Sequence, residues 1–217
     1  MMDEGAGAGV FKPPAPERVE IAGPAGQLEA LIEVPAGFDG RRAAVVCHPH
    51  PLFGGTMRNK VVHMTARAFQ ERGFSTLRFN FRGVERSQGT FDGGRGETDD
   101  AEAACAYAER LWPQAVFTLA GFSFGAYVAY QLAGRRPIER LVMIAPPVQR
   151  FDFGATAPPS APWTVIQGDQ DELVNHQQVV AWAHELSPAP TVRLIRGAEH
   201  FFHGRLQELK DAIQADL

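Results

Sequence analysis

A serine between two glycines is the feature of this chain that most clearly suggests a chemical reaction. The sequence Gly-Phe-Ser-Phe-Gly at 121–125 follows the apolar run 116–120 and precedes a second apolar run. Strand, Gly-x-Ser-x-Gly and helix is the order of a nucleophile elbow, a sharp turn that presents the serine hydroxyl. Glycines are needed two residues from the serine because side chains there would collide with the opposing backbone. The pattern predicts that Ser123 is a nucleophile rather than a loop serine between two turn glycines.

A serine hydroxyl is a weak nucleophile at neutral pH, so it needs a histidine base and a carboxylate that orients this histidine. After an elbow of this kind, the acid and then the histidine are expected downstream. The sequence Gly-Asp-Gln-Asp-Glu-Leu-Val at 168–174 follows an apolar run and offers three carboxylates. We predict that Asp171 is the acid. Asp169 and Glu172 remain alternatives, and all three also suit a turn or a helix cap.

The candidate base lies close to the end of the chain. The last apolar run, 192–195, is followed by Arg-Gly-Ala-Glu-His-Phe-Phe-His-Gly at 196–204. This loop holds two histidines, His200 and His203, and the pattern alone leaves both open.

Alternating strands and helices must bring these loops together. Short apolar runs, typical of strands buried on both faces, lie at 43–47, 74–79, 116–120, 141–145, 163–167 and 192–195. Helical patterns lie between or after them, near 61–71, 97–111, 124–132, 177–186 and 206–213. The segments 18–21 and 28–34, joined by a turn at 23–26, predict a leading hairpin. We therefore expect an α/β fold, with a doubly wound, mostly parallel sheet, an N-terminal antiparallel hairpin and helices on both faces.

Length and composition favour one globular unit. The chain has 217 residues, of which 45% are hydrophobic, and we expect a single domain over 18–217. Residues 1–17 are rich in Gly, Ala and Pro, and we expect them to form a flexible leader. Cys47 and Cys105 are the two cysteines, and they suit buried thiols better than a disulfide framework.

Charge and hydropathy limit the kinds of molecule that this protein is expected to bind. The net charge of −4 and the 21% of charged residues indicate neither a basic face for nucleic acid nor an acidic tail. No apolar stretch approaches the roughly 18 residues of a membrane span. We expect a soluble, cytoplasmic protein with a small-molecule partner, no nucleic acid, no membrane and no cofactor. Its oligomeric state, monomer or homodimer, is left open by the sequence.

Three motifs in this order, GFSFG, GDQDELV and GAEHFF, resemble those of the α/β-hydrolase fold. The sequence His-Pro-His-Pro-Leu-Phe-Gly-Gly-Thr-Met-Arg-Asn at 48–59 is similar to that of small bacterial members related to dienelactone hydrolases and to dipeptidyl aminopeptidases and acylaminoacyl peptidases. The resemblance covers about 18–217. It implies that Ser123 is the nucleophile, Asp171 the acid and His200 the base, with His203 less favoured. Dienelactone hydrolases carry cysteine at the nucleophile position, so lactone specificity does not follow.

The same resemblance implies a place for the oxyanion hole. One donor is the amide of the residue after the nucleophile, Phe124, and the other comes from the loop after the strand 43–47. Prolines at 49 and 51 have no amide hydrogen, which leaves the His50 amide as the expected donor and Leu52 or Phe53 as alternatives. The His48 side chain is expected to brace this loop.

No helical cap is expected. In related hydrolases with a lid, a helical insertion follows the strand that here is 141–145, whereas this chain has only a short stretch rich in Ala, Pro and Ser. The serine should therefore be relatively open. Phe53, Phe122 and Phe201 are the predicted substrate-binding residues, although the core is an equal alternative for aromatic side chains.

The predicted function is a serine hydrolase that cleaves small or medium carboxylic esters through an acyl-enzyme intermediate. Aminoacyl peptidase, thioesterase and acyltransferase activities use the same triad and remain alternatives, as does a non-catalytic small-molecule binding protein. A zinc site is the competing chemistry, because His48, His50, His200, His203 and Asp171 are all metal-ligand types. It gives no reason for the glycine-flanked serine, so we expect no metal.

Overall fold

The structure is a computed structural model, in which residues 11–217 are described. Residues 1–10 of the predicted leader lie outside the described residues. The strands are β1 (Glu17–Gly23), β2 (Gly26–Glu33), β3 (Arg42–Cys47), β4 (Ser75–Phe79), β5 (Val116–Phe122), β6 (Arg140–Ile144), β7 (Trp163–Gly168) and β8 (Thr191–Ile195). The helices are α1 (Lys60–Gln70), α2 (Arg95–Leu111), α3 (Phe124–Ala133), α4 (His176–Glu185) and α5 (Leu206–Gln214), with a 3-10 turn, η1 (Pro51–Phe53).

All eight strands belong to one sheet, in the order β1-β2-β4-β3-β5-β6-β7-β8. The β1–β2 hairpin is antiparallel, and β2 also pairs antiparallel with β4. From β4 to β8 every neighbouring pair is parallel. The predicted mostly parallel sheet with an antiparallel hairpin is confirmed, and the parallel strands end at one common edge, where ligand sites of such sheets lie.

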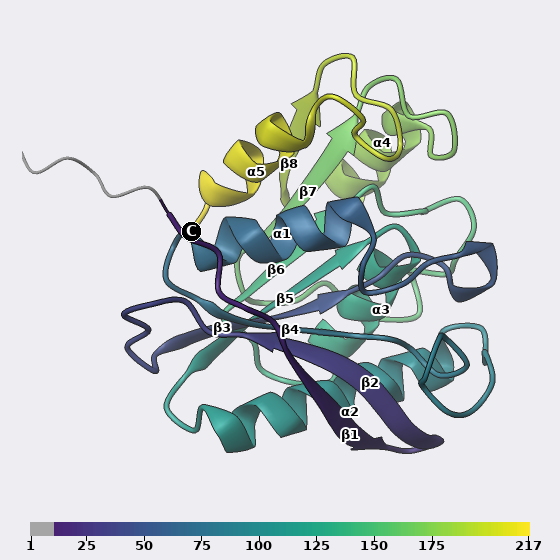
Figure 1. Cartoon of the computed structure of the whole chain (residues 1–217). Coiled ribbons are helices and arrows are strands. Elements are labelled where there is room, and N and C mark those ends of the chain that lie inside the picture. Colours follow the sequence, from purple (N-terminus) through teal and green to yellow (C-terminus); the bar gives the residue numbers. More distant parts are fainter. Residues whose placement is uncertain (1–10) are drawn as a thin grey trace, which may run out of the picture.

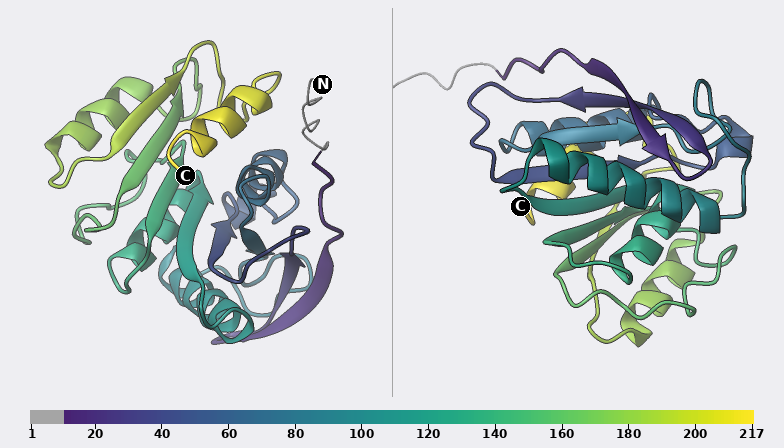
Figure 2. Two further views of the ribbon diagram at one scale, coloured as in Figure 1. Left: turned by 90° about the vertical axis from the view of Figure 1, so that its left-hand side faces the viewer. Right: turned by 90° about the horizontal axis from the view of Figure 1, so that it is seen from below.

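Helices cover both faces of this sheet (Figure 1, Figure 2). Residues of α1 and α5 belong to one core cluster, and residues of α2, α3 and α4 belong to the other. Strand β3 shows why a central strand is rich in apolar residues. Val45 points into the cluster below α2 and α3, whereas Val46 points into the cluster below α1 and α5. A strand covered on both sides is favoured to carry apolar residues in a nearly continuous run.

The outermost strand differs from this expectation. The run 192–195 was expected to be buried on both faces, but β8 lies at the edge of the sheet and the Leu194 side chain is 50% exposed. Its apolar composition is similar to that of a central strand, so the sequence did not distinguish the two positions.

A buried polar network links β2 and β4 to the segment 48–59. Arg78 forms an ion pair with Glu33 at 2.8 Å and donates to the Met57 carbonyl at 2.9 Å. Asn80 accepts from the Met57 amide at 2.9 Å and donates to Glu29 at 3.0 Å. Because a buried charge or amide is costly without partners, this network fixes the backbone on both sides of Met57.

The connection between β6 and β7 contains no helix, as expected for an uncapped fold. Tyr130 and Gln131 of α3 anchor this connection, since they donate to the carbonyls of Thr156 at 3.2 Å and Asp152 at 3.3 Å. This open crossover leaves the adjacent sheet edge accessible. Among the helices of residues 11–217, none has the length and hydropathy to cross a membrane.

Candidate active site

Ser123 lies at a strained turn between β5 and α3. Its backbone has φ 54° and ψ −119°, a conformation that non-glycine residues rarely adopt. The Ser123 amide donates to the Ile144 carbonyl at 2.8 Å, and its carbonyl accepts from the Ala126 amide at 2.8 Å. The residue is therefore held by the sheet on one side and by the helix on the other, as the elbow pattern predicts.

The two glycines of the elbow are required by close backbone contacts. A Cβ at Gly121 would lie 2.0 Å from the Gly125 carbonyl oxygen. A Cβ at Gly125 would lie 2.4 Å from the Cys47 carbonyl oxygen and 2.5 Å from that of His48. The start of α3 thus packs directly on the end of β3, which brings the segment after β3 beside Ser123.

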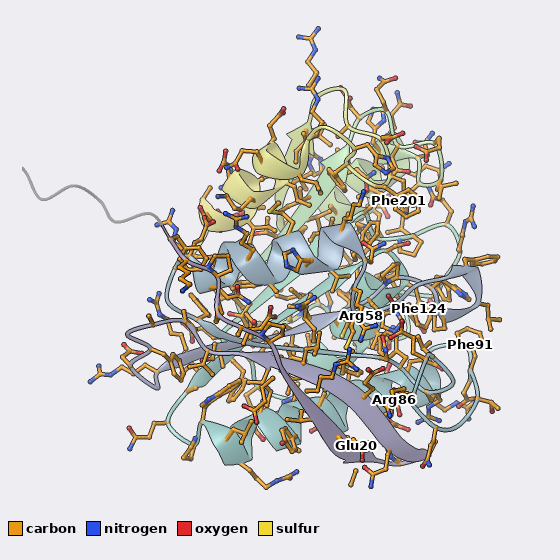
Figure 3. The ribbon with its side chains drawn as sticks, viewed as in Figure 1. Glu20, Arg58, Arg86, Phe91, Phe124 and Phe201 are labelled. Atoms are coloured by element: carbon orange, nitrogen blue, oxygen red, sulfur yellow. The ribbon has the colours of Figure 1, made fainter. Side chains whose placement is uncertain are left out.

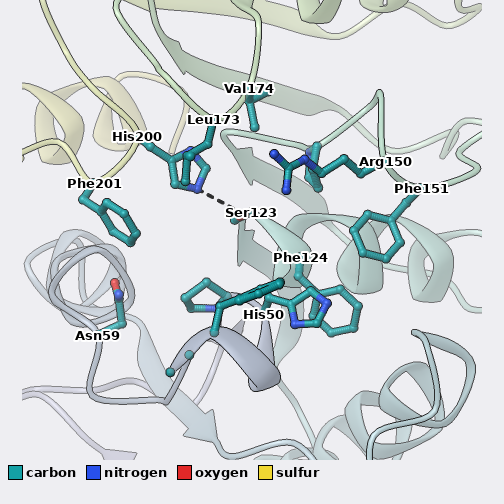
Figure 4. A pocket seen from close by; sticks show the side chains of 15 residues that line it. His50, Asn59, Ser123, Phe124, Arg150, Phe151, Leu173, Val174, His200 and Phe201 are labelled. Atoms are coloured by element: carbon teal, nitrogen blue, oxygen red, sulfur yellow. Dashed lines mark hydrogen bonds between the residues drawn. The ribbon is translucent and has the colours of Figure 1, made fainter.

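The structure brings Ser123, His200 and Asp171 into one hydrogen-bonded chain. His200 Nε2 lies 3.2 Å from Ser123 Oγ (Figure 4), and His200 Nδ1 lies 2.8 Å from Asp171 Oδ2. The serine follows β5, the acid follows β7 and the histidine follows β8, so three separate strand ends supply the three groups. The His200 side chain is only 3% exposed, and that of Asp171 is fully buried.

The carboxylate of Asp171 is fully engaged. Its Oδ1 accepts from the amides of Leu173 at 2.9 Å and Val174 at 2.8 Å, and its Oδ2 also accepts from Gln167 Nε2 at 2.9 Å. Burial by itself raises the pKa of Asp171, but His200 and these donors together hold the pKa below its ordinary value. Asp171 is therefore a fixed negative charge against the imidazole.

The alternatives for acid and base lie elsewhere. Asp169 accepts from the Gly197 amide at 2.6 Å, and Glu172 accepts from the His200 amide at 3.1 Å. Both carboxylates hold the backbone of the last loop, whereas Asp171 alone reaches the imidazole. His203 contacts Glu199 on the surface.

His48 braces the loop after β3. It is buried, its Nε2 accepts from the Phe81 amide at 3.0 Å, and its Nδ1 donates to the Pro49 carbonyl at 2.6 Å. Burial lowers the pKa of His48 to about 3, so the imidazole is neutral. With both ring nitrogens bonded to backbone, His48 is not free to bind a metal. Within residues 11–217, no group of three His, Cys, Asp or Glu side chains is arranged for a metal ion.

Backbone amides near Ser123 separate into bonded and free ones. The Leu52 amide donates to His50 Nδ1 at 3.2 Å, and the Phe53 amide donates to the His50 carbonyl at 3.1 Å. In the described part of the chain, the amides of His50 and Phe124 make no hydrogen bond. Both residues line the cavity that contains Ser123. Of the four amides that the sequence offered as oxyanion-hole donors, those of His50 and Phe124 are thus the ones free to donate.

The cavity around Ser123 has a volume of about 400 Å³ and a largely aromatic wall. Phe53 and Phe201, at 80% and 37% exposure, stand at its rim, and Phe151 forms another part of the wall (Figure 4). Phe124 and Phe201 both lie on the right-hand side of Figure 3, the side of this cavity.

Phe122 is a correction to the prediction of substrate-binding residues. It is completely buried, is not part of the cavity wall, and packs on the His200 ring with the two ring centroids 5.0 Å apart. As the last residue of β5 it points into the core under α1 and α5. The Phe122 ring therefore orients the His200 imidazole and has no surface left to contact a ligand.

Two residues of this site were missed by sequence reasoning. Gln167 is a polar residue at the end of a mostly apolar run, and this position could have marked it as a residue of the site. Arg150 lines the cavity from the irregular crossover between β6 and β7, where no periodic pattern marks it.

Comparisons with known proteins cover most of this chain. A profile of the alpha/beta hydrolase domain matches residues 43–214. An alpha-beta serine hydrolase homologue from Coxiella burnetii is 45% identical, with a TM-score of 0.90, over 93% of this chain and 97% of the other. XC6422 from Xanthomonas campestris, described as an a/b serine hydrolase without lid, is 41% identical, with a TM-score of 0.88, over 94% of each chain. Protein RP471 of Rickettsia prowazekii (strain Madrid E) is 40% identical over 206 residues, which are 90% of this chain and 86% of RP471.

Proposed function

We propose that this chain, which belongs to the alpha/beta hydrolase family, cleaves small or medium carboxylic esters through an acyl-enzyme intermediate. The observation that carries the proposal is the contact chain from Ser123 Oγ through His200 to Asp171. Its order, nucleophile to base to carboxylate, is the arrangement that activates a serine hydroxyl.

In the proposed reaction, Ser123 Oγ attacks the ester carbonyl carbon while His200 Nε2 takes the hydroxyl proton. Asp171 accepts a hydrogen bond from His200 Nδ1, which fixes the tautomer and stabilises the imidazolium. The carbonyl oxygen gains negative charge and is bound by the amides of Phe124 and His50. The C–O bond to the alcohol then breaks, and His200 returns the proton to the leaving alcohol. Water repeats the sequence on the acyl-enzyme and releases the acid.

The shape of the site supports esters of limited size. The cavity is open to solvent, has an aromatic wall and lacks a helical cap within the described residues. Thioesters and aminoacyl amides react by the same steps, so a panel of esters, thioesters and amides of matched acyl chains separates these substrate classes. We expect the highest kcat/KM for an ester.

A serine-reactive fluorophosphonate tests the nucleophile directly. We expect one covalent adduct per chain, on Ser123, because the hydroxyl adjoins a base and two free amide donors. Mass spectrometry of the labelled protein locates the adduct. Ser160→Ala, at an exposed serine of the crossover, is the matched control and should still label. Folded protein that fails to label would favour a binding protein on this fold.

Gln167 is expected to act as a positioning residue. Its Nε2 donates to the Asp171 oxygen that also accepts from His200, while its buried Oε1 has no hydrogen-bond partner among the described residues. Gln167→Leu should lower kcat about tenfold, because a hydrogen bond to a buried carboxylate is lost, with little change in KM. The pKa of Asp171 should rise because a donor to its ionised form is lost, so activity that depends on ionised Asp171 should be lost at a higher pH than in the unmodified protein.

Stability distinguishes this role from a structural one. Because Gln167→Leu also removes the unpartnered Oε1, the free energy of unfolding should change by less than about 1 kcal/mol. A variant that unfolds more readily but retains kcat and its pH profile would contradict the positioning role.

A further inference from the structure

The charge of the cavity wall is positive. The residues around Ser123 include no aspartate or glutamate, and Arg150 is the one permanently charged side chain among them. Asp171 does not offset it at the surface of the cavity, because the Asp171 side chain is fully buried behind His200. A ligand in this cavity therefore meets a guanidinium and no carboxylate.

Arg150 has no anionic partner in the described part of the chain. The ion pairs of residues 11–217 involve other arginines, and the Arg150 guanidinium belongs to none of them. The side chain extends from the crossover into the space beside Ser123 (Figure 4). An arginine directed into a cavity without a carboxylate is suited to bind an anion, since its planar donors match a carboxylate in pairs.

The backbone that carries Arg150 is anchored. The Arg150 amide donates to the Pro147 carbonyl at 2.9 Å, and Gln149 donates to the Asn175 carbonyl at 3.4 Å. The next residue, Phe151, stacks on Tyr127 of α3 with the ring centroids 4.8 Å apart. The backbone at Arg150 is therefore held in place, while the N–H donors of its guanidinium remain free to bind a ligand.

The His50 side chain belongs to a residue that lines the same cavity. Its Nδ1 accepts from the Leu52 amide, so the neutral ring carries its proton on Nε2. Burial, and next the charge of Arg150, lower the pKa of His50, which keeps the ring neutral. Its ring lies against Phe124 and Phe53, with centroids 5.0 and 4.7 Å apart.

We propose that the preferred substrates of this site are esters that carry a carboxylate, and that Arg150 binds this carboxylate while Ser123 attacks the ester carbonyl. This inference rests on the proposed ester hydrolysis and adds the substrate class. The carboxylate takes no part in bond making, so the acyl-transfer steps remain as given above.

Matched pairs of esters test the inference. Mono-p-nitrophenyl adipate and its neutral methyl ester place the carboxylate on the acyl side. The pair 4-acetoxybenzoate and methyl 4-acetoxybenzoate places it on the alcohol side. In at least one pair we expect the anionic ester to have the higher kcat/KM, and this preference should weaken as salt screens the charge.

Substitutions at Arg150 assign the preference to this side chain. Arg150→Gln should lower the ratio of kcat/KM for the anionic over the neutral ester about tenfold at low salt, and Arg150→Glu should lower it further. Arg150→Lys should keep most of the ratio. Arg41→Gln is the matched control, because this exposed arginine precedes β3 at the opposite end of the sheet, and its ratio should equal that of the unmodified protein.

The outcomes separate the inference from the function on which it rests. Serine-dependent turnover of the neutral esters, with no anionic preference or with a ratio unaffected by Arg150→Gln, overturns the inference and leaves ester hydrolysis intact. No turnover of any ester overturns the proposed function itself.

Discussion

Ser123→Ala is expected to lower the turnover of p-nitrophenyl butyrate at least about a thousandfold. The replacement removes the one oxygen that lies 3.2 Å from His200 Nε2 and leaves the cavity without a nucleophile. Residual activity would come from the free amides of Phe124 and His50 acting on water-mediated hydrolysis. The measurement is kcat/KM for p-nitrophenol release, with circular dichroism to verify that the fold is retained.

Ser160→Ala provides the comparison for this result, since it deletes an exposed hydroxyl from the irregular crossover and should leave turnover unchanged. If the Ser123 variant kept its activity, the acyl-enzyme mechanism would be wrong. Activity that persisted in this variant but disappeared with a chelator would instead favour a metal hydrolase.

Gly125→Ala is expected to destabilise the protein by about 3 kcal/mol or more, a large fraction of the stability of a typical domain. The added Cβ would meet the carbonyl oxygens of Cys47 and His48 at 2.4 and 2.5 Å. Both are backbone atoms at the end of a central strand, so the clash cannot be relieved by rotating a side chain. Urea unfolding, followed by tryptophan fluorescence, measures the effect.

Gly154→Ala is the control substitution for Gly125→Ala. This glycine is exposed, and its added Cβ would approach only the flexible Asp152 side chain, at 3.2 Å. We expect a loss of less than about 1 kcal/mol there. Equal unfolding midpoints for the two variants would show that α3 and β3 can separate at little cost, contrary to the packing described.

Much of the fold could be predicted because its central strands are covered on both faces. Strands β3, β5, β6 and β7 are mostly apolar, β4 combines apolar with polar residues, and the chain between most of these strands carries a helical pattern. The order of the strands in the sheet is a different matter. Inverting β3 and β4 changes neither the periodicity nor the composition of either strand, so local patterns do not fix it. Edge position was equally hidden, as β8 shows.

At the site, the sequence located the loops better than the side chains. Asp169, Asp171 and Glu172 occupy one short loop, and each bonds to a different group, a choice that depends on how the loop folds. Phe122 and Phe124 flank the serine symmetrically in sequence, but one ends a strand and the other starts a helix, so they point to opposite faces of the sheet. The sequence predicted a backbone role for Phe124 and a substrate contact for the Phe122 side chain, and it did not show that the Phe122 side chain is directed into the core.

The helix-free crossover between β6 and β7 can vary independently of the strands that carry Ser123, Asp171 and His200. Ser123, Asp171 and His200 all follow strands whose register is fixed by their neighbours. Arg150 and Phe151 instead belong to an irregular segment that can lengthen or change without disturbing that register. Evolution or design can therefore exchange the segment that we propose selects the substrate while Ser123, Asp171 and His200 stay in place. An insertion at this point would place a lid over the open cavity.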